Sequence, residues 1–434
     1  MRSGDAFLRN WFADWKSENR KWKLENREKG KREKGKKPNA EAQRTQRKRR
    51  DGEGKRAEMT RRAETDRWLF VVTLMLCLTG TVMIFSASAV TAQQLYGHSY
   101  VFMLRQVVWL LAGLAGMFGL MKMDYHRLRE PGVVYTALCL VAVLLICTFL
   151  LDKSHATHRW IKVGPINLQP SEMTKLVVIL YLAWFLDMKR RAATSLEFTK
   201  KDLVQTILPA VGPVLVCVGL IVLQPDLGTS IDILLIVTAI LFVAGLSWKW
   251  LAVGAGTAMP VVFALVMFVS YRHARIMSFL HPDQDPQGAG FQLMQSLIAV
   301  GSGGFSGVGL MEGKQKLFYL PEAHTDFIYA VICEELGFLG AVFVIALFAT
   351  YGWRGLRAAF NAPDRFGSML ALGVTAMVMC QCLINFAVVL GMMPTKGIPL
   401  PFVSYGGSSL LVMLLATGVL LNISQQAMRP AFRG

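Results

Sequence analysis

The sequence is poor in acidic residues, and it has no cysteine outside its apolar stretches. It contains 29 Asp and Glu against 47 Lys and Arg, a formal net charge of +18. All seven cysteines lie inside apolar runs, so they are typical of small hydrophobic residues rather than of disulfides or zinc ligands. The first long apolar run begins only after about 66 polar residues, so we expect no cleavable signal peptide.

The N-terminal segment is strongly basic, with 22 Lys and Arg against 12 Asp and Glu in residues 1–66. Such a segment cannot bury enough apolar surface to fold alone. We expect a disordered cytoplasmic tail, or one that becomes helical at an anionic leaflet. Basic tails beside membrane helices are common, so we expect no nucleic-acid partner. Alternatively, Met59 is the true start of the protein.

The rest of the chain is dominated by long apolar runs, and 53% of all residues are apolar. Runs near 20 residues are typical of membrane-spanning helices. We predict an all-α, polytopic membrane domain over residues 67–428, with ten transmembrane helices. The expected spans are 68–90, 106–121, 132–151, 171–188, 203–223, 229–245, 250–270, 327–351, 366–391 and 403–424.

Lys and Arg are distributed unevenly between the connections, which predicts the orientation. One set of connections holds 14 Lys and Arg, and the short connections of the other set hold five. The positive-inside rule then places both termini in the cytoplasm. The longest outer connection, residues 271–326 between the seventh and eighth spans, is predicted to be a structured loop with a helix near 291–300 and a Gly-rich turn at 301–309.

Polar residues gather at the expected outer ends of several spans. Ser171 is expected to cap a helix, with Glu172 in its first turn and Lys175 on the same face. These residues either form a local ion pair at a helix end, or Lys175 and Arg159 bind an anionic group of a substrate. Asp226 is expected to cap the sixth span. The stretch 393–409, with its prolines and glycines, is either a packing element or part of a site.

The most informative stretch is Glu322-Ala323-His324-Thr325-Asp326, which leads directly into an apolar helix. Ionisable groups at the mouth of a membrane helix are costly and therefore indicate function. The simpler interpretation is that Thr325 or Asp326 caps the eighth span. Cations of the same loop favour a site that binds phosphate and abstracts a proton; they are Arg272, Arg275, Lys314 and Lys316.

Four motifs in order resemble the SEDS family (shape, elongation, division and sporulation) of peptidoglycan polymerases. They are residues 159–161 with 169–175, residues 224–228, residues 320–328 and residues 401–409. Ala323 and residues 394–397 are more similar to the division proteins of the family, whereas residues 398–400 are nearer the elongation proteins. The turn at 155–158 departs from the family pattern.

The resemblance implies that the protein extends glycan strands from lipid II at the outer face of the bacterial cytoplasmic (inner) membrane during cell division. It places the family's essential aspartate at Asp326. It also implies a class B penicillin-binding protein and other division proteins as partners. A cofactor is unknown; a divalent cation such as Mg or Mn is one candidate, and the pair Asp283 and Asp285 is expected to form only a turn.

The chemistry expected from this resemblance needs one carboxylate. Diphosphate is a good leaving group, so Asp326 acts as a general base on the acceptor hydroxyl, and the displacement inverts the anomeric carbon. Cations stabilise the departing diphosphate. The predicted substrate-binding residues are Arg159, Glu172, Lys175, Arg275, Glu322, His324, Lys396 and Ser404. Alternative functions are a lipid II flippase, an elongation-type polymerase, or a scaffold that only recruits partners.

Overall fold

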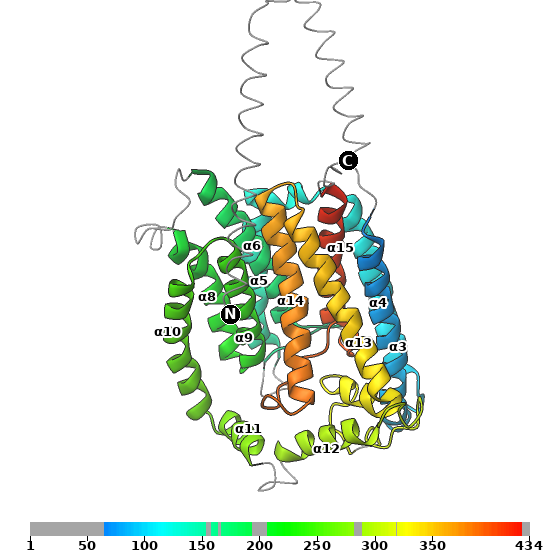
Figure 1. Cartoon of the computed structure of the whole chain (residues 1–434). Helices are drawn as coiled ribbons and strands as arrows, with labels where there is room; N and C mark the ends of the chain where they lie inside the picture. Colours follow the sequence, from blue (N-terminus) through cyan, green and yellow to red (C-terminus); the bar gives the residue numbers. More distant parts are fainter. Residues whose placement is uncertain are drawn as a thin grey trace, which may run out of the picture. The chain divides into compact units, whose positions relative to one another are not determined.

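A computed structural model describes residues 65–152, 158–163, 166–192, 206–281, 289–317 and 319–427 (Figure 1). Almost all of the predicted basic tail therefore lies outside the described residues. So do Asp283 and Asp285. In the described part the chain is overwhelmingly helical, which confirms the all-α prediction.

Each expected span corresponds to a helix. The helices are α3 (Arg67–Tyr96), α4 (Val101–Lys122), α5 (Pro131–Leu151), α6 (Pro170–Ala192), α8 (Leu208–Leu223), α9 (Leu227–Val243), α10 (Trp248–Met267), α13 (Ile328–Phe360), α14 (Arg365–Val389) and α15 (Gly407–Gln426). Among the described residues, seven helices are long and apolar enough to cross a membrane, and α8 and α9 are shorter apolar helices. The protein is thus a multi-pass membrane protein, while ten crossings stay a prediction.

Helices α14 and α15 form the centre of the bundle. In their most apolar 18-residue windows, 72% and 78% of the residues are buried inside the protein, against none in α10. Helix α15 packs closely on α4 because Gly418 has no side chain: a Cβ there would lie 2.7 Å from the Met117 carbonyl oxygen. The central position of α14 matters below, because its polar side chains reach the candidate site.

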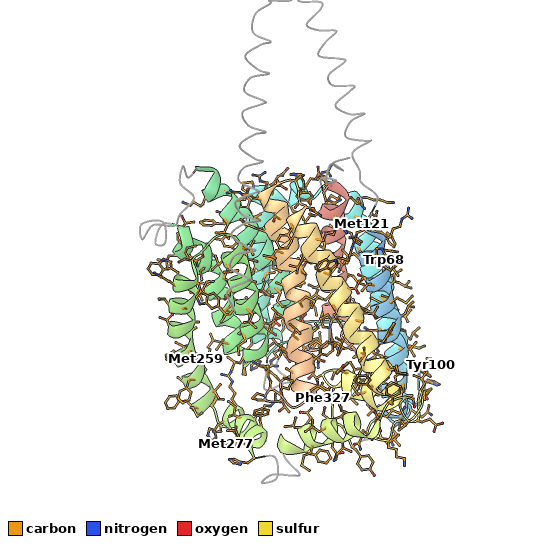
Figure 2. The ribbon with its side chains drawn as sticks, in the orientation of Figure 1. Trp68, Tyr100, Met121, Met259, Met277 and Phe327 are labelled. Carbon is orange, nitrogen blue, oxygen red and sulfur yellow. The ribbon has the colours of Figure 1, made fainter. Side chains whose placement is uncertain are left out.

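The long connection before α13 contains two helices, α11 (Ser270–Leu280) and α12 (Ala289–Ser302), at one end of the bundle (Figure 1). Helix α12 confirms the helix predicted near 291–300; α11 was not predicted. Phe327, the residue that precedes α13, lies towards this end, whereas Trp68 lies towards the other end (Figure 2).

Helix α13 is broken at Gly337, whose φ is +63° and ψ is −160°. The Gly-rich turn predicted at 301–309 packs against this break. The Val308 amide donates to the Glu334 carbonyl over 3.0 Å, and the Gly309 amide donates to the Glu335 carbonyl over 3.1 Å. Carbonyls that the break releases are therefore satisfied by the loop, as burial in a membrane protein requires.

The same loop is also held by a buried ion pair. Lys316 Nζ lies 2.6 Å from Glu335 Oε1 and donates to Ser86 Oγ over 2.9 Å. Lys316 is thus tied to α13 and α3. The described part of this loop that carries Lys316 is therefore packed against the bundle.

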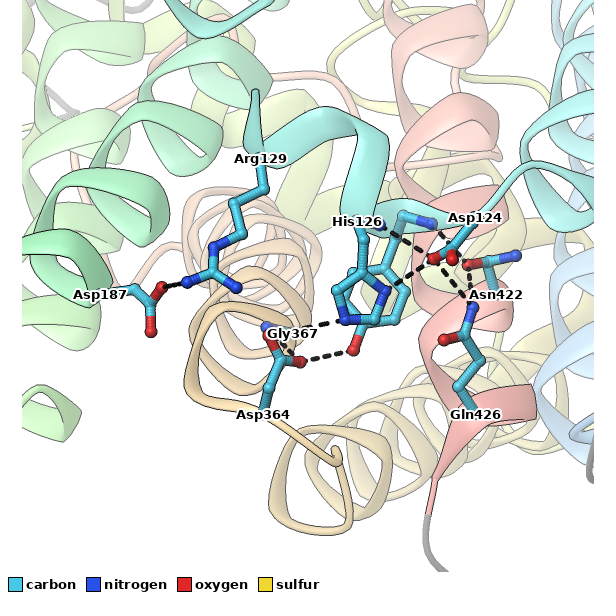
Figure 3. A network of polar contacts seen from close by, with 9 residues as sticks. Asp124, His126, Arg129, Asp187, Asp364, Gly367, Asn422 and Gln426 are labelled. Atoms are coloured by element: carbon cyan, nitrogen blue, oxygen red, sulfur yellow. Dashed lines mark hydrogen bonds and ion pairs between the residues drawn. The ribbon is translucent and has the colours of Figure 1, made fainter. Parts of the chain in front are cut away.

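The opposite end of the bundle has its own polar network, around the 3₁₀ helix η2 (Tyr125–Arg129) (Figure 3). The Tyr125 hydroxyl donates to Asp364, the N-cap of α14, and the Tyr125 amide donates to Asn422 Oδ1 over 3.1 Å. Arg129 pairs with Asp187 of α6. These contacts fix η2 to three helices at the end far from Asp326.

Candidate functional site

Asp326 is presented by a tight turn directly before α13. Glu322 has a φ of +55°, and its carbonyl accepts from the amides of Thr325 over 3.2 Å and of Phe327 over 3.3 Å. Phe327 is the N-cap of α13 and makes no side-chain capping bond. The expectation that Thr325 or Asp326 caps this helix is therefore wrong. The amides of Thr325 and Phe327 already bond to the Glu322 carbonyl, and the Asp326 carboxylate makes no capping bond to α13.

The stretch that precedes Asp326 is attached to the segment that leads into α15. The Tyr405 amide donates to the His324 carbonyl over 3.0 Å. Ser404 Oγ donates to the Thr325 carbonyl and accepts from the Leu400 amide over 2.8 Å. Ser404, predicted to bind substrate, is only 5% exposed, and its hydroxyl is used in this backbone contact.

The surroundings of Asp326 favour its protonated form more than water does. Burial raises the pKa of Asp326 to about 7, and the nearby Glu322 carboxylate adds to the rise. The charges of Arg275 and Arg159 act in the opposite direction. The side chain is largely buried but still reached by solvent. A carboxyl group that is half ionised near neutral pH is well suited to accept a proton in a reaction.

Two guanidinium groups near Asp326 are anchored by carbonyl oxygens. Arg275 Nη1 donates to the Thr395 carbonyl over 3.3 Å. Arg159 donates through Nε to the Gln224 carbonyl over 3.2 Å, and its Nη2 donates to the Pro225 carbonyl. Backbone carbonyl oxygens are thus among the partners of both guanidinium groups.

Lys396 is the third cation of this group. Its Cε would lie 3.2 Å from a Cβ at Gly228, and the Asp226 carboxylate lies beside the same glycine. Burial lowers the pKa of Lys396 to about 8, partly offset by Asp226. Asp226 also accepts from the Thr229 amide over 3.2 Å, which confirms the predicted cap. The motifs at 159, 224–228 and 396 therefore meet at one place.

Glu172 and Lys175 lie deeper in the protein, and their neighbour Asp232 is close enough to Lys396 for the two charges to interact. Glu172 and Lys175 form an ion pair of 2.9 Å, and each side chain is 2–3% exposed. Lys175 Nζ also lies 3.5 Å from Asp232 Oδ2, and Ser409 donates to Glu172 over 2.9 Å. The predicted pair is confirmed, but it is buried between helices. Substrate binding by these two residues stays a prediction.

One further expectation in this region, the helix cap at Ser171, is wrong. Helix α6 begins at Pro170, which suits the first helical position, so Ser171 lies inside the helix and is not its cap. His324 packs between the rings of Phe102 and Tyr405, with ring centroids 4.9 and 5.7 Å away. Burial lowers the pKa of His324 and thereby favours the neutral ring. Substrate binding by His324 stays a prediction.

The carboxylates of this region do not form a metal-binding set. In the part of the chain that the structure describes, no three His, Cys, Asp or Glu side chains come together in a way that could hold a metal ion. Asp326 and Asp226 instead lie among Arg and Lys side chains. Arg and Lys side chains thus provide positive charge in this region, and the divalent cation stays a prediction.

Sequence reasoning missed two amide side chains of α14. Gln381 accepts from Lys175 Nζ over 2.6 Å and donates to the Pro399 carbonyl over 2.8 Å. Asn385, one turn later, donates to the carbonyls of Asp326 and Ile398. Their four-residue spacing in an apolar span was the signal that could have found them. The short hairpin of β1 (Ile161–Val163) and β2 (Ile166–Leu168) was also not predicted.

Comparison with known sequences gives one family over nearly all of the membrane domain. The FtsW/RodA/SpoVE family of cell cycle proteins matches residues 67–429. The probable peptidoglycan glycosyltransferase FtsW of Trichlorobacter lovleyi is 42% identical over 366 residues, which cover 84% of this chain and 94% of the relative. The stage V sporulation protein E of Bacillus subtilis is 40% identical over 367 residues, with 84% and 98% covered.

Solved structures share the fold. A chain of a peptidoglycan synthase complex, described as coordinating polymerization and crosslinking, matches with a TM-score of 0.67 and 30% identity over 83% of this chain and 98% of that chain. The rod shape determining protein RodA of Thermus thermophilus matches with a TM-score of 0.61 and 27% identity over 85% and 99%.

Proposed function

The chain belongs to the FtsW/RodA/SpoVE family of cell cycle proteins, and we propose that it is a peptidoglycan glycosyltransferase of the FtsW type with Asp326 as its general base. FtsW relatives at about 40% identity over most of the chain support the activity and the division role. The observation that carries the assignment of the base is the Asp326 carboxyl at the mouth of α13, with its pKa raised to about 7 by burial.

In the proposed reaction, the acceptor hydroxyl attacks the anomeric carbon of a lipid-linked donor as the bond to the diphosphate breaks. Asp326 takes the proton of the hydroxyl, and the electron pair of the broken bond leaves with the diphosphate. Because the displacement is direct, the configuration inverts and no covalent enzyme intermediate forms. A positioned general base of this kind contributes roughly 10²–10⁴-fold to a rate.

The diphosphate gathers negative charge as it leaves, and Arg275, Arg159 and Lys396 are the cations we assign to it. Arg275 and Arg159 are close enough to act on the Asp326 charge, and Arg275 acts on Lys396 as well. A group that binds the diphosphate therefore lies beside the base, as a single displacement requires. Glu322, on the exposed side of the turn, is assigned to the approach of the acceptor.

The donor is proposed to be lipid II, and the partner a class B penicillin-binding protein together with other division proteins. The similarity to a complex that joins polymerization with crosslinking supports such a partner. We place the protein in the bacterial inner membrane with both termini in the cytoplasm, because Lys and Arg are concentrated in one set of connections. Residues 1–66 would then be a cytoplasmic tail and residues 67–428 the catalytic domain.

Polymerisation of labelled lipid II by the purified full-length chain, with and without the partner, tests this function. We expect glycan strands from the native chain and none above background from Asp326→Asn. Native polymerisation rates from the Asp326→Asn enzyme would reject the assigned base. Movement of lipid II across liposomes in the absence of any polymer would instead favour the flippase.

A further inference from the structure

Asp326 is the last of three consecutive residues whose carbonyl groups accept hydrogen bonds from later parts of the chain. Residues 404–405 hold the carbonyls of residues 324 and 325. The Asp326 carbonyl is held differently, by the side chain of Asn385 from the centre of the bundle, over 2.8 Å. The backbone of the proposed base is thus attached to a helix that is itself deeply buried.

Asn385 bonds to two segments at once. Its Nδ2 donates to the Asp326 carbonyl and to the Ile398 carbonyl, each over 2.8 Å, and the residue is 1% exposed. Both partners are acceptors, so the side-chain nitrogen and not the oxygen must face them. One amide group therefore joins the stretch that carries the base to the stretch that follows Lys396.

Gly397, which lies between Lys396 and Ile398, contacts the Asp326 carboxylate. A Cβ at Gly397 would lie 2.8 Å from Asp326 Oδ2, so the carboxylate rests against the bare backbone of Gly397. This contact depends on the distance between the backbones of Asp326 and Gly397. Asn385 bonds to the carbonyl of Asp326 and to that of Ile398, the residue after Gly397, and so fixes this distance. Gln381, on the same face of α14, holds the next carbonyl along, that of Pro399, over 2.8 Å.

We propose that Asn385 is a positioning residue for the general base: by bonding the Asp326 and Ile398 carbonyls together, it holds the Asp326 carboxylate against Gly397 in one orientation. The inference rests on the proposed function, since it assumes that Asp326 is the base. Asn385 acts through the backbone of Asp326 and does not touch the reacting atoms. A carboxylate that can turn freely spends less time aligned with the acceptor hydroxyl, which lowers the rate of the chemical step.

A purely structural role gives a different result. Pairing two buried carbonyls stabilises the fold, and losing that pairing lowers the melting temperature alone. A positioning role also changes the rate per folded molecule and the ionisation of Asp326. Ser296 is a matched control, because its buried hydroxyl donates to the Val389 carbonyl over 2.9 Å, also at the end of α14, but does not reach the Asp326 stretch.

The test compares Asn385→Leu, Asn385→Ala and Ser296→Ala in the full-length protein, with lipid II as substrate. Leu keeps the shape of Asn without its donors, and Ala serves if Leu does not give folded protein. For Asn385 variants we expect kcat to fall about 10-fold with KM changed less than about twofold. We also expect the acidic limb of the kcat/KM profile to move to lower pH, because a loosened carboxylate gains water.

Two results separate failure of this inference from failure of the proposed function. If both Asn385 variants match Ser296→Ala in kcat and in the acidic limb, while Asp326→Asn is inactive, Asn385 is structural and the positioning role is wrong. If Asp326→Asn polymerises normally, the base itself is misassigned. Restoration of kcat by Asn385→Gln, relative to Asn385→Leu, would support the need for a donor at this place.

Discussion

Lys175 and Glu172 form an ion pair of 2.9 Å that is buried inside the helical bundle. Lys175 also faces Asp232, and through Gln381 it is connected to the loop at Pro399. A single buried cation beside two carboxylates offsets one of their two negative charges. Lys175 thus joins α6 to α9 and α14.

Removing the Lys175 charge should therefore destabilise the protein. Lys175→Met removes the cation that lies 2.9 Å from Glu172 and 3.5 Å from Asp232, and we expect a loss of about 3–5 kcal/mol in the free energy of unfolding. The measurement is denaturation of the detergent-solubilised protein. The double variant Lys175→Met/Glu172→Gln should recover part of the loss. An unchanged melting temperature for Lys175→Met would show that the pair does not hold the helices.

Replacing the proposed base should abolish the reaction and leave the fold intact. Asp326→Asn keeps the size of the side chain but cannot accept the proton, so we expect kcat to fall about 10²–10⁴-fold. The melting temperature should not fall, because burial disfavours the ionised form of this group. Labelled lipid II polymerisation and thermal unfolding measure the two effects.

The pH dependence should follow the ionisation of Asp326. The group works only as a carboxylate, so kcat/KM should rise with pH through about 7. If the Lys396 ammonium holds the diphosphate, the rate should fall as pH passes about 8, where that charge is lost. A bell-shaped profile between these values is the expected outcome, and a flat profile from pH 6 to 9 would contradict it.

Two neighbours should move the acidic limb in opposite directions. The Glu322 charge raises the pKa of Asp326, so Glu322→Gln should shift the limb to lower pH. The Arg275 charge lowers that pKa, so Arg275→Met should shift the limb to higher pH. Steady-state rates over a pH series measure both shifts. Shifts of the same sign would mean that the limb reports another group.

A methyl group at position 397 should displace the carboxylate. In Gly397→Ala the new Cβ would lie 2.8 Å from Asp326 Oδ2, a distance that the two atoms cannot keep. Misplacing a catalytic group by about 1 Å can cost roughly 10²-fold, so we expect a loss of kcat of that order. Gly254→Ala is the control, because a Cβ there meets no atom within 4 Å. Equal kcat values for the two variants would show that Gly397 does not help to place the Asp326 carboxylate.

The features that could be predicted from the sequence are those formed by residues of a single short segment. The Asp226 cap, the Glu172 and Lys175 pair and helix α12 all depend on residues a few positions apart. The helix caps at Ser171 and at Thr325 or Asp326 were predicted wrongly because Pro170 opens α6 and the turn at Glu322 already satisfies the backbone before α13. Propensity alone does not reveal such competition between neighbours.

The sequence by itself determined that this is a helical membrane protein with a carboxylate at the mouth of its eighth expected span, because apolar runs in a bilayer must close their own hydrogen bonds. Only the tertiary structure decided which groups surround that carboxylate. In the tertiary structure Lys175 is buried, Arg275 and Arg159 lie near Asp326, and Asn385 donates to the Asp326 carbonyl. These contacts join residues far apart in the chain, and their partners are fixed by how the helices pack and not by local pattern.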